Sequence, residues 1–338
     1  KLNDNKDYSD VPPEIFNLIN KDSSDCSICI QHSLPHLCEP NYRFKKNIIY
    51  FAWETNNFID SGWFLHLNLF DEIWVINPDQ KDACLKSGVK KPIYVVPHAF
   101  DPEKYQNLDS LPPLDLPVNK DSFLFYFIGE FNRRKNLPAL IRAFHGEFDR
   151  NENVDLVLKV NKPGSTTESL EKELGELCLE VKKGLKLYQK PDMYKKELII
   201  SQRLSEVDMM RLHQRCNSFI STSLGEAFML PAAQSLFAGN SLIASNYGGL
   251  RTLIESDPLS PYIYDVSYRM APAFGFLDSA AFNLYTAHEE VVDIDIIDLK
   301  KKMRTPFNRN KEIRKIGIGI KVPNENKFGE GEPTIKIN

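Results

Sequence analysis

The sequence predicts an α/β protein of two domains, each built around a parallel β-sheet. Short apolar segments alternate with helical segments along most of the 338 residues, as in parallel strands joined by crossover helices. A proline-rich segment at 108–118 divides the chain, and its length suits two domains. Hydrophobic residues make up 42% of the chain, which is enough to fill two cores.

The first domain is expected over residues 1–107. A short helix begins at the prolines near residue 12, and a second helix is expected over 79–87. Four apolar segments are expected to be strands: 26–31, 47–52, 73–76 and 93–96. A complete Rossmann-like domain opens with a strand and a glycine-rich turn, which this sequence lacks. We therefore predict an N-terminal domain that is short or truncated.

Residues 108–118 form the predicted linker, and residues 119–305 form the predicted second domain. This domain begins with a continuous apolar strand at 123–128, suited to burial on both faces. Further strands are expected at 154–160, 198–200, 217–221 and 241–245, and helices at 137–148, 205–216 and 231–239. Residues 306–338 are polar, and they are interpreted either as a tail that returns to the first domain or as a loose segment.

The segment from Phe219 to Gly249 carries the strongest functional signal. A strand ends near Ser221, a loop with Glu226 follows, and Pro231 marks the first turn of a helix. Open α/β sheets bind ligands beyond the carboxyl ends of their strands, and a helix N-terminus offers free N–H groups to phosphate. The loop is therefore a candidate site for a phosphate-bearing ligand.

A basic turn follows the first strand of the second domain. It reads Gly129-Glu-Phe-Asn-Arg-Arg-Lys-Asn136 and places Arg133, Arg134 and Lys135 at the carboxyl end of that strand. A glycine allows the backbone to approach a ligand closely, and cations at this edge of the sheet can bind an anionic ligand. The alternative interpretation is a basic turn that only faces solvent.

The segment around Glu226 resembles the retaining glycosyltransferases of the GT-B fold, in the large group 1 (family 4-like) that uses nucleotide-sugars. That family carries a Glu-x7-Glu motif within a Glu-Gly-Phe-Gly-Leu-Pro loop and the following helix. Here the first Glu is Glu226, the second position is Gln234, and the loop reads Glu226-Ala-Phe-Met-Leu-Pro231. The resemblance extends roughly over 48–304. It implies two Rossmann-like domains that face each other across a cleft.

The resemblance also implies roles for individual residues. Glu226 would hold the donor sugar, and Gln234 would contact the donor ribose. Lys135 matches the family lysine of the diphosphate site, and Arg133 or Arg134 would replace the family arginine. The implied donor-binding residues are Gly129, Arg133, Arg134, Lys135, Arg203, Leu204, Phe228, Met229, Leu230 and Gln234.

Two first-domain residues complete the predicted catalytic set with Glu226. His32 and Glu54 each follow a predicted strand, so they are expected to face the cleft and contact the sugar or the acceptor. A single histidine in such a place is more often structural than catalytic, and that alternative stays open.

Two segments resemble metal-binding motifs, and each also has a structural explanation. Cys26, Cys29, His32, His36 and Cys38 have spacings that zinc sites use, but strand alternation would send neighbouring side chains to opposite faces. Asp293-Ile-Asp295 looks like the Asp-x-Asp motif of another transferase fold, but Asp295 fits a helix N-cap. We therefore expect no metal and no cofactor, with a UDP- or GDP-sugar as substrate.

Composition limits the partners and the compartment. The net charge of −4, without a basic block, argues against nucleic acid as a partner. No apolar run reaches membrane-spanning length, and no signal peptide is visible at the start. Six sparse cysteines indicate a reducing, cytoplasmic setting. Peripheral membrane association from the cytoplasmic side and oligomeric association are left open.

The predicted function is metal-independent transfer of a sugar from a nucleotide-sugar to a glycan, lipid-linked or protein acceptor, with retention of configuration. A non-catalytic nucleotide-sugar-binding subunit is the main alternative, because Ala227, Met229 and Gln234 depart from the family motif. A third interpretation is a nucleotide-sugar epimerase or a base-glucosylating enzyme. The acidic balance argues against DNA as the acceptor.

Overall fold

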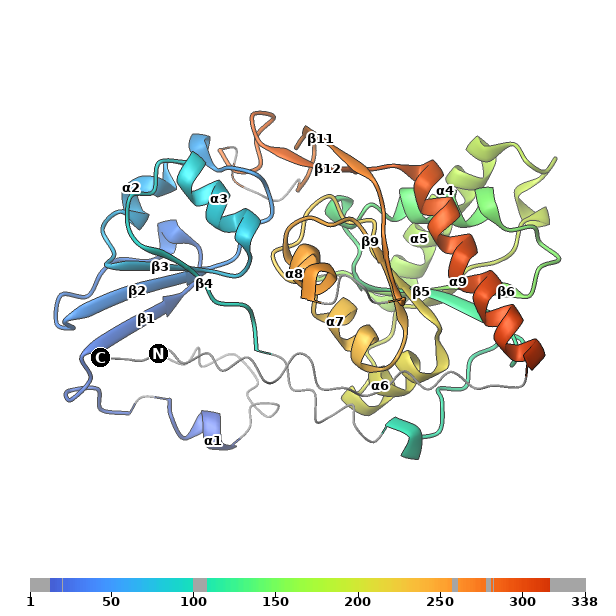
Figure 1. Cartoon of the computed structure of the whole chain (residues 1–338), viewed down its shortest axis with the longest axis horizontal. Coiled ribbons are helices and arrows are strands. Elements are labelled where there is room, and N and C mark those ends of the chain that lie inside the picture. The colour runs from blue at the N-terminus through green and yellow to red at the C-terminus, as the bar shows by residue number, and fades with distance from the viewer. Residues whose placement is uncertain are drawn as a thin grey trace.

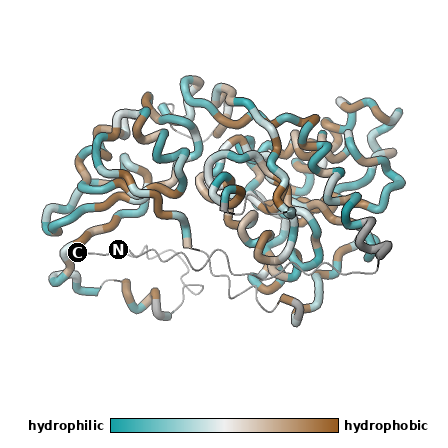
Figure 2. Tube along the Cα trace, viewed as in Figure 1, coloured by the Kyte–Doolittle hydropathy of each residue, from teal (hydrophilic) through white to brown (hydrophobic). Residues whose placement is uncertain are grey.

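The structure is a computed structural model of the chain, and it describes residues 13–19, 21–99, 108–256, 261–277, 281 and 283–316. Two separate parallel sheets form the framework, one in each half of the chain (Figure 1). Hydrophobic stretches run through the strands of both halves (Figure 2). The predicted α/β class with two Rossmann-like sheets is therefore confirmed.

The first sheet has four strands in the order β1-β2-β3-β4, all parallel. The strands are β1 (Ile28–His32), β2 (Lys46–Phe51), β3 (Glu72–Val75) and β4 (Ile93–Val95). The register sets Ile49 beside Ile73 and Ile73 beside Ile93, which makes a continuous apolar row on one face. These four strands are the sheet of the first domain in the described residues, and a short or truncated first domain stays a prediction.

Three short helices are described in the first domain, and the second and third of them contribute side chains to the core of the sheet. They are α1 (Pro13–Phe16), α2 (Trp63–Leu67) and α3 (Pro78–Lys86), with single 3-10 turns at η1 (Pro35–Leu37) and η2 (Ile59–Ser61). Helix α3 begins where the Asn77 side chain accepts a hydrogen bond from the backbone N–H of Gln80, with Pro78 in the first turn. Phe51, Trp63 and Leu67 belong to the buried cluster beneath these helices.

The second sheet has six parallel strands in the order β10-β9-β8-β5-β6-β7. Their bounds are β5 (Phe123–Glu130), β6 (Val154–Asn161), β7 (Leu198–Ile200), β8 (Ser218–Ile220), β9 (Ser241–Ala244) and β10 (Ile263–Asp265). The first six residues of β5 are all buried, as its unbroken apolar sequence predicts. β5 therefore occupies an inner position in the sheet.

Helices cover both faces of the second sheet. They are α4 (Leu137–Glu147), α5 (Thr167–Leu185), α6 (Glu206–Arg215), α7 (Leu230–Phe237), α8 (Gly249–Ser256) and α9 (Ile296–Ile316), with 3-10 turns η4 (Leu108–Ser110), η5 (Arg133–Lys135) and η6 (Pro191–Met193). Phe125 of β5 packs against Phe144 of α4. The next residue, Tyr126, points to the opposite face and contacts His213 of α6. The α4 side also carries α5 and α9.

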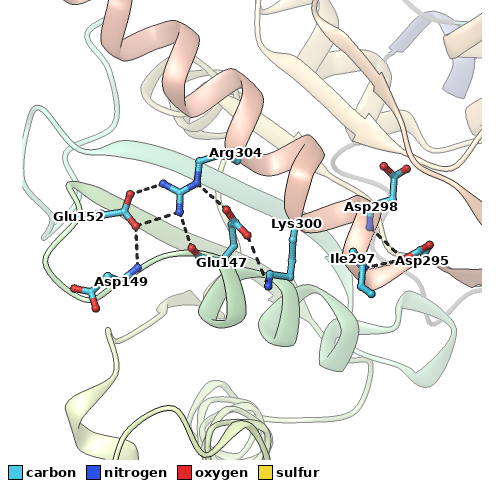
Figure 3. Close-up of polar contacts among 8 residues, drawn as sticks. All are labelled: Glu147, Asp149, Glu152, Asp295, Ile297, Asp298, Lys300 and Arg304. Atoms are coloured by element: carbon cyan, nitrogen blue, oxygen red, sulfur yellow. Dashed lines mark hydrogen bonds and ion pairs between the residues drawn. The ribbon is translucent and has the colours of Figure 1, made fainter.

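Helix α9 is fastened to α4 by charged contacts (Figure 3). Arg304 donates from Nε to Glu147 Oε1 at 2.7 Å and from Nη2 to the Glu147 carbonyl at 2.6 Å, and it pairs with Glu152. The Asp295 side chain accepts hydrogen bonds from the N–H groups of Ile297 and Asp298, which confirms Asp295 as the helix cap. Asp295 therefore serves helix α9 as a cap.

The predicted boundary between the second domain and the tail, at 305 and 306, lies inside α9. The helix continues to Ile316 and contains Pro306. Phe307 packs against Phe123 and Phe148, so this turn belongs to the core of the second domain. The prediction that a tail returns to the first domain concerns residues 317–338, which lie outside the described residues.

An antiparallel hairpin connects the two halves. It consists of β11 (Tyr268–Pro272) and β12 (Glu290–Ile294) and lies between the two larger sheets (Figure 1). The Glu290 carbonyl accepts a hydrogen bond from Asn56 N at 3.2 Å, and Val292 N donates to the Leu224 carbonyl at 2.7 Å. The hairpin therefore contacts the first domain and the Glu226 loop at once.

The described part of the linker is fixed along α6. The Arg211 carbonyl accepts a hydrogen bond from Leu114 N, and Arg211 Nε donates to the Pro112 carbonyl. Gln214 Nε2 donates to the Leu108 carbonyl.

Within the described ranges, no helix is both long and apolar enough to cross a membrane.

Candidate functional site

The loop between β8 and α7, residues 221–229, lies where the ends of the two parallel sheets meet. The Ala227 carbonyl accepts a hydrogen bond from Asn77 Nδ2 of the first domain at 2.8 Å. A Cβ atom on Gly225 would lie only 2.4 Å from the Glu54 carbonyl oxygen, so this close approach requires glycine. The Glu226 loop is therefore in direct contact with the first domain.

The turn Gly248-Gly249 supports the other side of the same loop. Gly248 has a φ of +62° and lies so close to the Glu226 carbonyl that a Cβ atom would be 2.4 Å away. Gly249 N donates to the Glu226 carbonyl at 2.7 Å. Gly248 N donates to Asp79 Oδ2 at 2.8 Å, and Arg251 pairs with the other Asp79 oxygen. The backbone of Glu226 is thus held by a turn that itself binds the first domain.

Glu226, Arg134 and Lys135 form a buried charged cluster. The Glu226 carboxylate accepts from Arg134 Nη1 at 2.8 Å and from Lys135 Nζ at 2.5 Å, and its side chain is 4% exposed. Burial by itself raises the pKa of Glu226, but the Lys135 ammonium and the Arg134 guanidinium outweigh burial and hold that pKa below its ordinary value. Glu226 is therefore an ionised carboxylate with a counter-charge on two sides.

The two arginines of the basic turn have different contacts. Asn132 caps the 3-10 turn η5, and Asn136 ends it with a φ of +50°. Arg134 reaches Glu226 and the Gly225 carbonyl, whereas Arg133 lies over the Phe274 ring at 5.7 Å. Sequence reasoning left open which arginine joins Lys135. In the structure it is Arg134.

Glu54 from the first domain lies next to this cluster. Its carboxylate accepts a hydrogen bond from the Tyr285 hydroxyl at 2.7 Å, and it helps to raise the pKa of Arg134 after the larger contribution of Glu226. Tyr285 stacks on Trp53 with a ring separation of 4.3 Å, and burial raises the pKa of its hydroxyl. Glu54 and Glu226 therefore act on the same guanidinium from two domains.

His32 lies in a separate aromatic group. Its ring stacks on Tyr50 at 4.6 Å, and Tyr50 shares a hydrogen bond of 3.1 Å with His98 Nδ1. His98 in turn lies 5.7 Å from the Phe228 ring of the Glu226 loop. His32 is thus connected to this loop through Tyr50 and His98, on the side of Phe228. The sequence analysis did not select His98, although its position after the strand at 93–96 was a usable signal.

Two predicted ligand contacts have other partners in the structure. The side chain of Gln234 lies beside His213, a buried imidazole whose pKa burial lowers to about 4. At Gly129, a Cβ atom would lie 2.6 Å from the Phe127 ring, so the missing side chain makes room for that ring. Here the glycine accommodates protein packing, and a donor contact by Gln234 stays a prediction.

The remaining predicted donor residues have mixed environments. Met229 is buried in the core of the second domain, and Leu204 packs partly against that core. Arg203 is exposed, and Leu230 is 43% exposed in the first turn of α7. No side chain caps α7; Ala232 N and Ala233 N donate to the Met229 carbonyl, and Pro231 has no N–H group.

The cysteine and histidine residues of the zinc-like spacing are dispersed. His36 stacks against Trp63, His32 stacks against Tyr50, and Cys38 is buried in the core. Among the described residues, no group of three or more His, Cys, Asp or Glu side chains is arranged to hold a metal ion.

The chain has the fold of the GT-B glycosyltransferases. Two domains built on parallel sheets, with the Glu226 loop where they meet, have this architecture. Residues 115–258 match the family described as Glycosyl transferases group 1. The matched segment contains the basic turn, Glu226 and the Gly248-Gly249 turn, and the predicted resemblance is confirmed there.

Solved structures share this fold at low sequence identity. One, described as trehalose-6-phosphate from E. coli bound with UDP-2-fluoro glucose, is 12% identical with a TM-score of 0.52, and the match covers 70% of this chain and 62% of that one. An alpha,alpha-trehalose-phosphate synthase (UDP-forming) from Burkholderia xenovorans, in complex with glucose-6-phosphate, is 14% identical with a TM-score of 0.51, covering 86% and 74%.

A third similar structure is the N-terminal domain of a Candida albicans trehalose-6-phosphate phosphatase, 13% identical with a TM-score of 0.54, covering 82% of this chain and 62% of that one. This chain thus spans less than two thirds of some of the structures that it matches. At such identities the likeness shows the fold alone. No curated protein sequence matches this chain.

Proposed function

We propose that this protein transfers a sugar from a nucleotide-sugar donor to an acceptor, without a metal ion and with retention of configuration. The observation that carries the proposal is the buried cluster of Glu226, Arg134 and Lys135 at the junction of two parallel sheets. The family match covers the same residues, and one structure of this fold is described as bound with UDP-2-fluoro glucose. A UDP- or GDP-sugar is therefore the proposed substrate, and no cofactor is needed.

Arg134 and Lys135 are proposed to hold the donor diphosphate. Departure of a nucleoside diphosphate concentrates negative charge on the leaving group, and preorganised cations stabilise that charge. Arg134 uses only Nη1 in its contacts with Glu226 and Gly225, so its other donors remain available to a phosphate. The positive end of the α7 helix dipole would add to the same anion site.

Glu226 is proposed to change partners during the reaction cycle. In the structure its carboxylate neutralises the two cations, as a diphosphate would. A bound diphosphate would compete for the cations and release carboxylate oxygens toward sugar hydroxyls. That contact would orient the donor for attack. Glu54 and His32, from the first domain, are proposed to face a glycan, lipid-linked or protein acceptor.

A non-catalytic binding subunit is the second candidate. Gln234 has a neutral amide where the family motif carries a carboxylate, and its structural partner is His213. Met229 is buried in the core where the family loop has a glycine. These features would preserve nucleotide-sugar binding without efficient turnover. A cytoplasmic location suits either candidate, because all six cysteines are unpaired.

The deciding experiment measures release of nucleoside diphosphate from a panel of UDP- and GDP-sugars. We expect slow release with one donor, faster release when an acceptor is added, and loss of release in Glu226→Ala. Arg133→Ala is the matched control, because Arg133 lies against Phe274 and outside the cluster. Binding of a donor without release in the presence of acceptor mixtures would support the subunit, and no binding of any donor would contradict both candidates.

A further inference from the structure

Two lysines in the second domain are equally buried but differently paired. Lys159 of β6 and Lys182 of α5 are each 7% exposed. Lys182 Nζ donates to Glu197 Oε2 and to the Lys195 carbonyl, both at 2.7 Å. Lys159 Nζ has one contact, to the carbonyl of the adjacent Val160 at 3.3 Å. In the part of the chain that the structure describes, no carboxylate pairs with Lys159.

An ammonium group buried without a counter-charge lowers the stability of a folded protein. Removal of a cation from water costs several kcal/mol unless an anion or several hydrogen bonds compensate for the loss. Burial lowers the pKa of Lys159, and no neighbouring acid offsets that effect. Methionine would fill a similar volume without this cost. A lysine at this position is therefore explained better by a role in ligand binding than by a contribution to the stability of the fold.

Lys159 lies near the carboxyl ends of the strands, on the same face of the sheet as helix α7, which follows the Glu226 loop. The register pairs it with Ile128 of β5 and Ile200 of β7. Side chains two residues apart share a face, so Lys159 and Ile128 share the face of Tyr126, whose hydroxyl contacts His213 of α6. Gln234 of α7 lies beside the same His213, so α6 and α7 cover this face.

We infer that Lys159 is a third cation of the donor site and that its ammonium binds a phosphate oxygen of the nucleoside diphosphate. The inference rests on the proposed function. Arg134 and Lys135 already share the Glu226 carboxylate, whereas Lys159 has no anionic partner within the described ranges. Ligands of open α/β sheets bind beyond the carboxyl ends of the strands, which is the end where Lys159 lies. A diphosphate there would supply its counter-charge.

The test compares Lys159→Met with Lys182→Met in two measurements. Without ligand, we expect Lys159→Met to raise Tm by about 2–4 °C, the shift that removal of a cost of about 1 kcal/mol gives in a domain of this size. Lys182→Met should lower Tm, because Glu197 loses one of its two partners, the other being His145. With UDP and GDP, Lys159→Met should weaken binding roughly 10- to 100-fold, as for loss of a charged hydrogen bond. Affinity for uridine and guanosine should stay unchanged.

The outcomes separate the inference from the proposed function. Wild-type binding of UDP or GDP with equal binding by Lys159→Met overturns the inference and leaves the function standing. Absence of nucleotide binding by the wild type overturns both. Equal loss of UDP and uridine affinity would indicate a packing role and also overturns the inference. If Lys159→Met does not fold, Lys159→Gln provides the same comparison, because its neutral amide also lacks the ammonium charge.

Discussion

The carboxylate of Glu226 lies 2.5 Å from the Lys135 ammonium, inside a junction between two domains. The two residues are 91 positions apart in the sequence and come from different loops at the ends of β5 and β8. Both are almost fully buried, so each depends on the other for its charge. A ligand that competes for this ion pair therefore acts on binding and on stability together.

Replacement of Glu226 should lower stability when no ligand is bound and should lower turnover when the donor is bound. Glu226→Ala leaves Arg134 and Lys135 buried without an anion, which should cost about 3–5 kcal/mol of the free energy of unfolding. Because UDP would supply the missing charge, its stabilising Tm shift should be larger in the variant than in the wild type. The kcat of the variant should fall strongly, since the proposed sugar contact acts on the chemical step. An unchanged kcat would contradict the assignment of Glu226.

Lys135→Ala should weaken binding of nucleoside diphosphate by about 1.5–3 kcal/mol, the range for hydrogen bonds to charged groups. Arg133→Ala should bind nearly as well as the wild type, because Arg133 lies over Phe274. Calorimetric titration of both variants with UDP and GDP checks this. Equal losses for the two variants would show that only the overall positive charge of the turn matters.

Gln234→Ala should raise the donor KM with little change in kcat, because a ribose contact is the same in the ground and transition states. The same change removes the side chain beside buried His213 and should therefore also lower the melting temperature. Gln234→Glu should be tolerated and should tighten donor binding through a charge-assisted bond. Steady-state kinetics beside thermal unfolding separates the two effects. A lost kcat with an unchanged KM would show that Gln234 has been assigned the wrong role.

Glu289 should make stability fall as the pH rises from about 5 to 7. Burial raises its pKa to about 7, while its side chain accepts a hydrogen bond from Thr55 at the contact with the first domain. The folded state holds this proton at pH values where the unfolded chain has released it, so folding is favoured most at low pH. Over the range between the two pKa values, the cost is on the order of 3 kcal/mol.

The variant Glu289→Gln cannot titrate at this position and should lose that part of the pH dependence. Thermal unfolding of the wild type and the variant between pH 5 and 8 provides the comparison. Parallel curves for the two proteins would mean that the Glu289 carboxylate is not protonated in the folded protein.

A chelator such as EDTA should leave donor turnover largely intact. The proposed diphosphate site uses Arg134, Lys135 and the positive end of the α7 helix dipole, so the charge of the leaving group is balanced without a divalent ion. Release of nucleoside diphosphate is measured before and after chelation. Complete loss of activity that returns on addition of metal would contradict the proposal.

Local patterns were sufficient for most of the sheet framework. The strand at 198–200 was predicted with its observed bounds, and the strand at 123–128 lacked only Gly129 and Glu130. Continuous apolar segments bounded by turn residues make buried parallel strands recognisable. Helix α5 was not predicted, although Thr166 caps it and Leu170, Leu174 and Cys178 have helical spacing. The hairpin β11–β12 was also missed, because its strands pair across a long separation.

The sequence by itself determined the α/β class, the loop of Glu226 and the basic turn, since each depends on residues close together in the chain. Only the tertiary structure decided that Arg134, and not Arg133, reaches Glu226 and that Gly129 accommodates Phe127. Only the tertiary structure shows that Lys159 is buried without a carboxylate partner in the described part of the chain. These facts depend on side-chain direction and on segments brought together by two sheets, which local spacing does not encode.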